Sequence, residues 1–441
     1  YDRVVEGSSY SKQLLGAPKP RESLGGLLAS QPSRLLFFST LLRPFTMLWS
    51  KGFNCGNIVV KFAEPISVRH LLKQHQARGP GVDKTGLVVA LAHRVTWSIN
   101  QNTVIVPTCL VSTVLLTHSC RGISFSDLVE HVQWLTQEVL TRGGLVSPME
   151  EAAKAVSSTL KRIDKLVKYP SPNNTLEPLL RPRDSRRLDL AYYRNQCLHI
   201  FVEEALVLCC LVSMKSEAKS KGTHWVRMEA LRRDAQVLAE IFKMEFTYRP
   251  RSGVDNFNAA VHRLIIRGAV TQLYDDGYGE RIQLLSTPQA RRLVSLLRGM
   301  LLPFLDAYWV AALSLLPLQA EAKSGVVLRG HVQRMQKIAQ TMYLENKVHS
   351  CEAASSETLC NALSVFEFVG IITRTPTPDG EALLRVRQDA LLASARSLPR
   401  APTSDPSSKP PLFASLVDAI RKLDAKRRVA ATQMYEDTIV S

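Results

Sequence analysis

The pattern of apolar residues is helical over a long central part of the chain. It follows a Gly- and Pro-containing stretch at 76–86, which reads as a linker, and continues to about residue 222. The segment 127–140 is the clearest case, because its apolar residues fall on one helix face and its charged residues fall opposite; the apolar set is Leu128, Val132, Leu135 and Val139. A polar segment with several prolines, 168–187, is predicted to be a loop between helices.

Two later stretches repeat one pattern of elements. Residues 224–286 predict two helices and then a β-hairpin, with an Asp-Gly turn between two β-compatible runs. A similar unit follows at 356–386, where a helix, a Gly and two short strands surround the turn PTPDG. A helix followed by a two-stranded wing resembles winged-helix architecture.

The amino-terminal part has a different pattern. The run IVVKF at 58–62 predicts a buried strand, and Ser67 is expected to cap the helix that follows.

The sequence as a whole predicts a mainly α fold in three parts. Residues 1–78 form the end of an α/β domain, 79–398 a helical domain with winged-helix-like units, and 399–441 a Pro/Ser-rich linker with a basic amphipathic tail.

Net charge narrows the choice of ligands. The chain has 441 residues, of which 56 are Lys or Arg and 39 are Asp or Glu, giving a formal net charge of +17. Such a surplus favours anionic ligands, including nucleic acid, anionic lipid and phosphorylated small molecules. The eight cysteines form no Cys-x-x-Cys pair and no zinc-like spacing with His, so they read as reduced core residues and no metal site is predicted.

Catalytic motifs are missing from the sequence. It contains no P-loop, no G-x-G-x-x-G, no G-x-S-x-G and no H-E-x-x-H. None of the ten His residues is followed by Asp five positions later; the nearest arrangements are His199 with Glu204 and His224 with Glu229. Because these pairs lie about a turn and a half apart on helical patterns, they are poor partners for acid–base chemistry.

Two basic groups are candidates for binding phosphate. One, in the opening loop, consists of Lys12, Lys19 and Arg21; the other consists of Arg181, Arg183, Arg186 and Arg187. Arg and Lys near helix starts commonly bind phosphate, although solvated loop charges explain the same pattern. A nucleic-acid reader would need polar residues along the second helix of a unit, but the helix around Arg263 is largely apolar, so no nucleic-acid partner is expected.

No run of 18 or more uninterrupted apolar residues occurs. The nearest candidates are 103–117, 197–214 with Glu203 and Glu204, and 296–318 with Arg298 and Asp306. These are interpreted as buried or partly membrane-facing helices. The last is placed in a membrane interface, with Tyr308 and Trp309 at headgroup depth.

Several separated pieces resemble the glycerolipid acyltransferases that use glycerol 3-phosphate or dihydroxyacetone phosphate. They occur in the family's order and cover most of the chain: YDRVVEG, LLGAPKPRES, IVVKFAEPISVRHLL, AYYRNQCLHIFVEEAL and LLRGMLLPFLDAYWVAALSLL. The second and fourth lean toward the dihydroxyacetone-phosphate enzyme, and the first toward the mitochondrial glycerol-3-phosphate enzyme.

The resemblance implies that this chain is a C-terminal fragment. The family's catalytic His-x4-Asp, its acceptor-binding Gly motif and its Pro-Glu-Gly motif precede the position of Tyr1, so no catalytic residue is assigned and the fragment alone is expected to be inactive. In the family, a His held by Asp activates the acceptor hydroxyl for attack on the acyl-CoA thioester. The residues that match the family's Lys-Pro-x-Glu-Ser loop are expected near the phosphate of the substrate: Lys19, Arg21, Glu22 and Ser23.

The same resemblance sets expectations for ligands and location. Acyl-CoA is the co-substrate, a phosphorylated three-carbon molecule is the acceptor, and no cofactor or metal is needed. The protein is expected at a membrane surface, peroxisomal or at the mitochondrial outer membrane, although its last residues, Ile-Val-Ser, depart from the Ser-Lys-Leu import signal. The alternatives are a nucleic-acid-binding winged-helix protein and a helical scaffold that has lost catalysis and supports another subunit.

Overall fold

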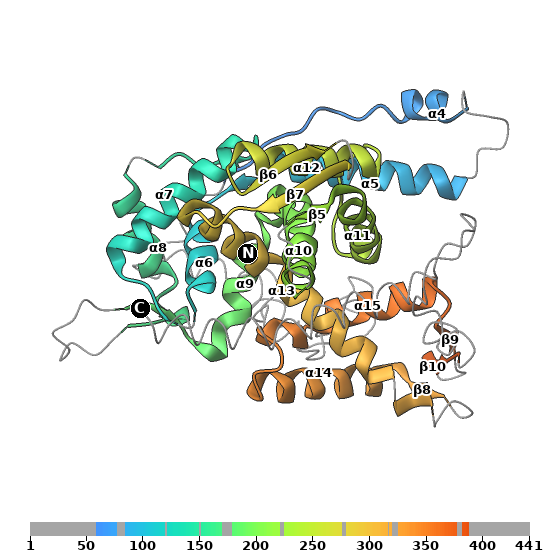
Figure 1. Ribbon diagram of the computed structural model, residues 1–441. Coiled ribbons are helices and arrows are strands. Elements are labelled where there is room, and N and C mark those ends of the chain that lie inside the picture. The colour runs from blue at the N-terminus through green and yellow to red at the C-terminus, as the bar shows by residue number, and fades with distance from the viewer. Residues whose placement is uncertain are drawn as a thin grey trace, which may run out of the picture. The chain divides into compact units, whose positions relative to one another are not determined.

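A computed structural model describes most of the chain between residues 59 and 387 (Figure 1). The described ranges are 59–76, 84–119, 121–149, 151–169, 179–220, 225–275, 279–315, 317–319, 325–376 and 382–387. Helices dominate them, which confirms the mainly α prediction. The chain divides into two compact units. The described residues of the first lie at 59–62 and within 102–196, and those of the second lie within 63–101 and 197–387.

The first unit is built around one short apolar helix, α6 (Pro107–Thr117), which has seven consecutive buried residues, 109–115. Because its apolar residues cover every side, α6 is enclosed by neighbours, and it packs against α7 (Phe125–Thr141), α8 (Ala152–Arg162) and α9 (Arg187–Asn195). Ser124 caps α7 by accepting from the Asp127 backbone N–H at 3.0 Å. The predicted apolar face of α7 is confirmed, since all four of its residues are fully buried.

Short strands tie the helices of this unit together. β1 (Val104–Ile105) pairs in parallel with β2 (Leu145–Val146). β3 (Val167–Lys168) pairs antiparallel with β4 (Arg181–Pro182), and short 3-10 turns flank them at η2 (Asp164–Leu166) and η3 (Asp184–Arg186). The prediction of a plain loop at 168–187 is therefore wrong at its ends, because β3 pairs with β4 there, and η3 and the start of α9 fall within the same range.

The second unit has two long apolar helices at its centre, α10 (Leu198–Ser220) and α13 (Pro288–Leu315), which pack against each other. α10 also contacts α11 (Met228–Ile241) and α12 (Gly253–Ile266). α13 contacts α14 (Leu328–Leu344) and α15 (Ser356–Phe368). Each long helix therefore serves as the core of one group of helices.

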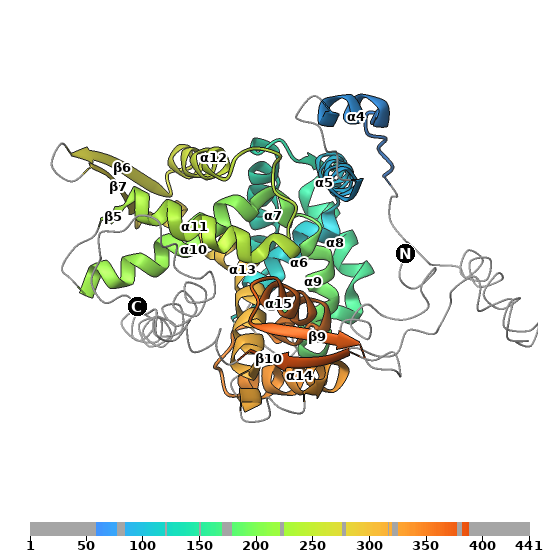
Figure 2. The same ribbon diagram turned by 90° about the vertical axis from the view of Figure 1, so that its right-hand side faces the viewer.

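Each group carries a small antiparallel sheet. The first sheet has the order β5-β7-β6, from β5 (Val226–Arg227), β6 (Val270–Asp275) and β7 (Gly279–Leu284). The second has the order β8-β10-β9, from β8 (Val326–Val327), β9 (Ile372–Pro376) and β10 (Ala382–Val386); its hairpin is clear in Figure 2. Three short 3-10 segments complete the unit: η4 (Phe242–Met244), η5 (Pro317–Gln319) and η6 (Cys351–Ala354).

The two groups match residue by residue. Phe257, Ala260, Val261 and Leu264 are the buried positions of α12, and Leu359, Ala362, Leu363 and Phe366 occupy the same places in α15, each 102 residues later. Both hairpins are entered through a Gly with positive φ, Gly268 and Gly370, at the same separation. The two helix–hairpin segments predicted at 224–286 and 356–386 thus share one arrangement of elements, with an additional short strand in each sheet.

The amino-terminal described segment differs from the prediction. Residues 59–67 form neither helix nor strand, and Val60 and Phe62 are 71% and 89% exposed, so a buried strand at 58–62 is wrong over its described part. The cap is confirmed: Ser67 Oγ accepts from the His70 backbone N–H at 3.3 Å at the start of α4 (Val68–Gln76). α5 (Lys84–Asn102) follows.

Candidate functional site

The residues predicted to meet the substrate phosphate, namely Lys19, Arg21, Glu22 and Ser23, lie outside the described residues, as does Lys12. Their role in binding phosphate stays a prediction. Among the described residues, the candidates are the second basic group in the first unit and, separately, the buried polar side chains of the second unit.

The arginines of the second basic group contact their own fold. Arg181 Nη2 donates to the Arg121 carbonyl at 2.9 Å, and Arg183 Nε donates to the Val167 carbonyl at 3.0 Å. The other two form ion pairs within a helical turn: Arg186 with Asp189 at 3.0 Å, and Arg187 with Asp184 at 2.9 Å. These contacts fasten β4, η3 and the start of α9, so the structural reading accounts for the group better than a phosphate site does.

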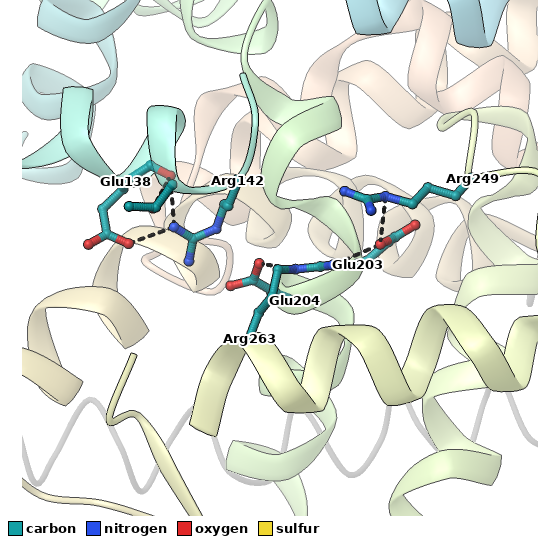
Figure 3. Close-up of polar contacts among 7 residues, drawn as sticks. Glu138, Arg142, Glu203, Glu204, Arg249 and Arg263 are labelled. Atoms are coloured by element: carbon teal, nitrogen blue, oxygen red, sulfur yellow. Dashed lines mark hydrogen bonds and ion pairs between the residues drawn. The ribbon is translucent and has the colours of Figure 1, made fainter. Parts of the chain in front are cut away.

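A cluster of charged side chains is built into the second unit (Figure 3). α10 presents two adjacent carboxylates, and Arg263 of α12 bridges them: its Nε donates to Glu204 Oε1 at 2.7 Å and its Nη2 to Glu203 Oε2 at 2.8 Å. Arg249, from the connection before α12, lies 3.6 Å from Glu203. We call these four residues the α10–α12 ion cluster.

Burial determines what this cluster can do. Glu204 has no exposed surface and the Glu203 side chain is 10% exposed, so the two guanidinium groups offset part of the cost of burying both carboxylates. A carboxylate that already accepts from an arginine at 2.7 Å is poorly placed to take a proton from a substrate. The cluster therefore positions α10 against α12.

A second polar contact lies among aromatic rings of the same unit. Tyr308 of α13 donates its hydroxyl hydrogen to Glu245 Oε1 at 3.2 Å, and the Tyr308 ring packs edge-on against Phe242. Burial raises the pKa of Glu245 to about 7, and the hydrogen bonds from Asn361 and Tyr308 only partly offset this effect. Burial, with the nearby Glu245 carboxylate, also raises the pKa of Tyr308 above its usual range.

This contact corrects one prediction. Tyr308 is 1% exposed and bonded within the unit, so it does not lie at headgroup depth. The reason is that the aromatic side chain has a buried acceptor for its hydroxyl group and needs no contact with water or lipid headgroups.

His331 and Ser314 form a buried pair that resembles a nucleophile with its base. The Ser314 oxygen lies 3.1 Å from His331 Nε2, but the Ser314 hydroxyl also donates to the Ala311 carbonyl at 2.7 Å. His331 has no exposed surface, and burial lowers its pKa to about 4, with Arg334 adding to the effect. Since Ser314 is only 3% exposed, a substrate cannot reach the pair, which reads as core packing.

In the part of the chain that the structure describes, no group of three or more His, Cys, Asp or Glu side chains is placed to hold a metal ion. One helix there, α13, is long and apolar enough on its own to cross a membrane; 67% of its most apolar window is buried inside the protein, as in the core helix of a globular domain.

Comparison with known proteins identifies the family. Residues 40–375 match the model of the glycerol-3-phosphate acyltransferase C-terminal region. The chain belongs to this family. The match spans every element from α4 to α15 and most of β9, so the fold just described is that of an acyltransferase C-terminal region.

Curated relatives agree with that assignment. The chain is 24% identical over 397 residues to the dihydroxyacetone phosphate acyltransferase of Oryctolagus cuniculus and 26% identical over 398 residues to that of Bos taurus. Each match covers 85% of this chain and 53% of the relative. A glycerol-3-phosphate acyltransferase of Xanthomonas campestris is 27% identical over 222 residues, 48% of this chain and 23% of the relative. The chain thus spans about half the length of the animal relatives.

The sequence draws attention to the charged residues of the α10–α12 ion cluster, but it does not indicate that they contact one another. Glu203 and Glu204 stand out as paired charges inside the apolar run 197–214, and Arg263 is one of few polar residues in its helix. Nothing in the spacing of 59 residues indicates that α10 and α12 lie side by side. That contact follows from the repeated arrangement, in which each long helix packs against the helix that precedes a hairpin.

Proposed function

We propose that this chain is the C-terminal part of an O-acyltransferase. The whole enzyme moves a fatty acyl group from acyl-CoA to a hydroxyl of dihydroxyacetone phosphate or glycerol 3-phosphate, an early step of glycerophospholipid and ether-lipid synthesis. The observation that carries the proposal is the family match over residues 40–375, joined to relatives that are named for both acceptors.

Dihydroxyacetone phosphate is the acceptor we favour. The relatives named for it match over 85% of this chain, whereas the bacterial relative named for glycerol 3-phosphate matches over 48%. The basic surplus of the chain suits the substrates, because acyl-CoA and either acceptor are anionic. No cofactor or metal takes part in the proposed transfer.

The catalytic base is assigned to sequence outside residues 1–441. No His in the chain is followed by Asp at the spacing that the resemblance requires, so we propose that this chain alone does not transfer acyl groups. Its role is to complete and support the catalytic part. Residues 19–23 hold the phosphate end of the acceptor, with Lys19 and Arg21 supplying positive charge.

We also propose association with a membrane surface, peroxisomal or at the mitochondrial outer membrane, because the acyl donor and product are amphiphilic and the protein is cationic. We propose the same three parts as the sequence predicts. Residues 1–78 are the end of the acyltransferase domain, 79–398 are the helical domain with winged-helix-like groups, and 399–441 are a linker and a basic tail.

A nucleic-acid-binding function is the weaker alternative. A groove-reading helix needs free guanidinium groups, but Arg263 of α12 donates to Glu203 and Glu204 within the unit. α12 is therefore occupied in packing. The scaffold alternative differs from our proposal only in the activity of the whole protein, and the assay below separates the two.

The test uses the full-length protein that contains this chain, with labelled palmitoyl-CoA and each acceptor in turn. We expect transfer to dihydroxyacetone phosphate, and no transfer by purified 1–441 above a heat-killed control. Lys19→Ala with Arg21→Ala should raise KM for the acceptor at least tenfold, whereas Lys51→Ala, outside the loop, should leave it unchanged. Transfer to neither acceptor by the full-length protein overturns the proposal, and transfer by 1–441 overturns the placement of the base.

A further inference from the structure

Exposed apolar side chains are concentrated in one stretch of the described sequence. Of the twenty large apolar residues that are exposed among the described residues, eight lie between residues 59 and 99. The other twelve are scattered singly or in pairs over the much longer part from Phe125 to Phe368. Scattered apolar residues are normal on a protein surface, but a local concentration marks a surface that another molecule covers.

α5 carries the most regular part of this surface. Val88, Val95 and Ile99 are 64%, 40% and 59% exposed, and Ala92 between them is exposed as well. No side chain from Gly86 to Gln101 is buried. The steps from 88 to 92, 95 and 99 are four, three and four residues, so the four side chains form one stripe along the helix. We call these four residues the α5 stripe.

The shape of the stripe indicates what fits it. A four-three-four spacing of small and β-branched residues is the seam of a helix that packs against another helix. A helix that lies on a lipid surface needs instead a wide face with bulky Trp, Phe or Leu, and positive charges opposite it. The α5 stripe consists of alanine and β-branched residues and contains no Trp, Phe or Leu, which favours a protein partner over lipid.

Charge and sequence position restrict the partner further. α5 contains Lys84 and Arg94 and no Asp or Glu, so a second copy of α5 would bring like charges together. The stripe also lies in the second described range from the amino end, 84–119. The family match is to a C-terminal region, and the animal relatives have about as much sequence again beyond the part that matches.

From these observations we propose that the α5 stripe is the docking surface for an apolar helix, flanked by acidic residues, from the amino-terminal half of the acyltransferase. The inference rests on the proposed function, because it takes the partner to be the remainder of that enzyme. The exposed residues Val60 and Phe62 lie just before α4 and extend the same apolar character toward that half in sequence.

Hydrogen exchange of the backbone amides of residues 84–102 tests the proposal. It is measured in purified 1–441 and in the full-length protein that contains it. We expect these amides to exchange at least tenfold more slowly in the full-length protein. Val95→Glu and Ile99→Glu place a carboxylate in the seam and should restore fast exchange. His93→Glu is the matched control, because His93 is exposed on the opposite side of the same helix and should leave the protection intact.

Four results overturn the proposal: equal exchange in both proteins, slow exchange already in 1–441 alone, slowing of 1–441 by vesicles of phosphatidylcholine with phosphatidylserine, or a concentration-dependent dimer of 1–441 that Val95→Glu abolishes. Acyl transfer is measured on the same full-length preparation. Protection of α5 without acyl transfer refutes the proposed reaction and leaves the docking surface, whereas transfer with an unprotected α5 refutes the docking surface alone.

Discussion

Arg263 and Glu204 form an ion pair of 2.7 Å between α12 and α10, and the Glu204 side chain has no contact with solvent. The same guanidinium group holds Glu203 at 2.8 Å. Arg263 of α12 thus bridges two adjacent carboxylates of α10, and Arg249 places a second guanidinium group beside Glu203.

Removing this arginine should destabilise the second unit strongly. Arg263→Ala leaves Glu204 buried without its partner, so we expect a loss of about 3–5 kcal/mol in the free energy of unfolding. Urea unfolding of 1–441 measures it, with His262→Ala as control because His262 is the exposed neighbour on the same helix. Combining Arg263→Met with Glu203→Gln and Glu204→Gln should recover part of the loss. A loss below about 1 kcal/mol for Arg263→Ala would contradict the account.

The helices were predictable because local patterns determine them. The faces of α7 and α12, the cap at Ser67 and both hairpins follow from spacing and turn residues within a few positions. The strand predicted at 58–62 failed because an apolar, β-branched run specifies a strand only where a neighbouring strand is present, and residues 59–62 have none in the described structure.

The pH dependence of stability should contain a contribution from Glu245. Its pKa of about 7 in the folded protein lies above the ordinary 4.5, so the folded state favours the protonated carboxyl. This contribution is complete below pH 4.5 and is lost as pH rises through 7; by linkage the loss is about 3 kcal/mol. Glu245→Gln cannot ionise and keeps an acceptor for Tyr308.

We therefore expect Glu245→Gln to match the parent at pH 4.5 and to exceed it by about 3 kcal/mol at pH 8. Urea unfolding at four pH values between 4.5 and 8 measures the difference. Glu229→Gln, an exposed position on α11, should show no such rise. Equal stability of Glu245→Gln and the parent across this range would refute the assignment.

His331 should act in the opposite direction. Burial lowers its pKa to about 4, so its contribution is complete above pH 6.5, the ordinary value, and is lost as pH falls through 4. α11 and α14 each begin directly after a short strand, β5 and β8, 100 residues apart, and the position of α11 that corresponds to His331 on this count is the buried Leu231. His331→Leu should thus raise stability relative to the parent by about 3 kcal/mol between pH 6.5 and pH 4. Urea unfolding measures this change, and a constant difference over that range would count against it. His93→Gln is the exposed control.

Contacts distant in sequence could not be predicted. Glu245 meets Tyr308 across 63 residues and Arg263 meets Glu204 across 59, and each requires the packing of helices whose order in space the sequence does not display. The arginines at 181–187 show the same limit, because Arg181 and Arg183 donate to the carbonyls of Arg121 and Val167, which are distant in sequence. Local charge density predicts a binding site only when the fold leaves that charge unpartnered.

Replacing glycine by alanine should have opposite effects at the start of a hairpin and inside a helix. Gly268 has a φ of +65° and open space where a Cβ would lie, so the new methyl group in Gly268→Ala meets no neighbour. The left-handed backbone conformation alone should lower the free energy of unfolding, by about 1 kcal/mol. Gly299 lies inside α13, also with open space, but in helical conformation, so Gly299→Ala should stabilise by about 0.5–1 kcal/mol. Thermal unfolding of both variants beside the parent decides the matter. Gly370→Ala, at the matched position with a φ of +82°, should follow Gly268→Ala, and a stabilising effect at either would show that the entry to the hairpins is not held in the left-handed conformation.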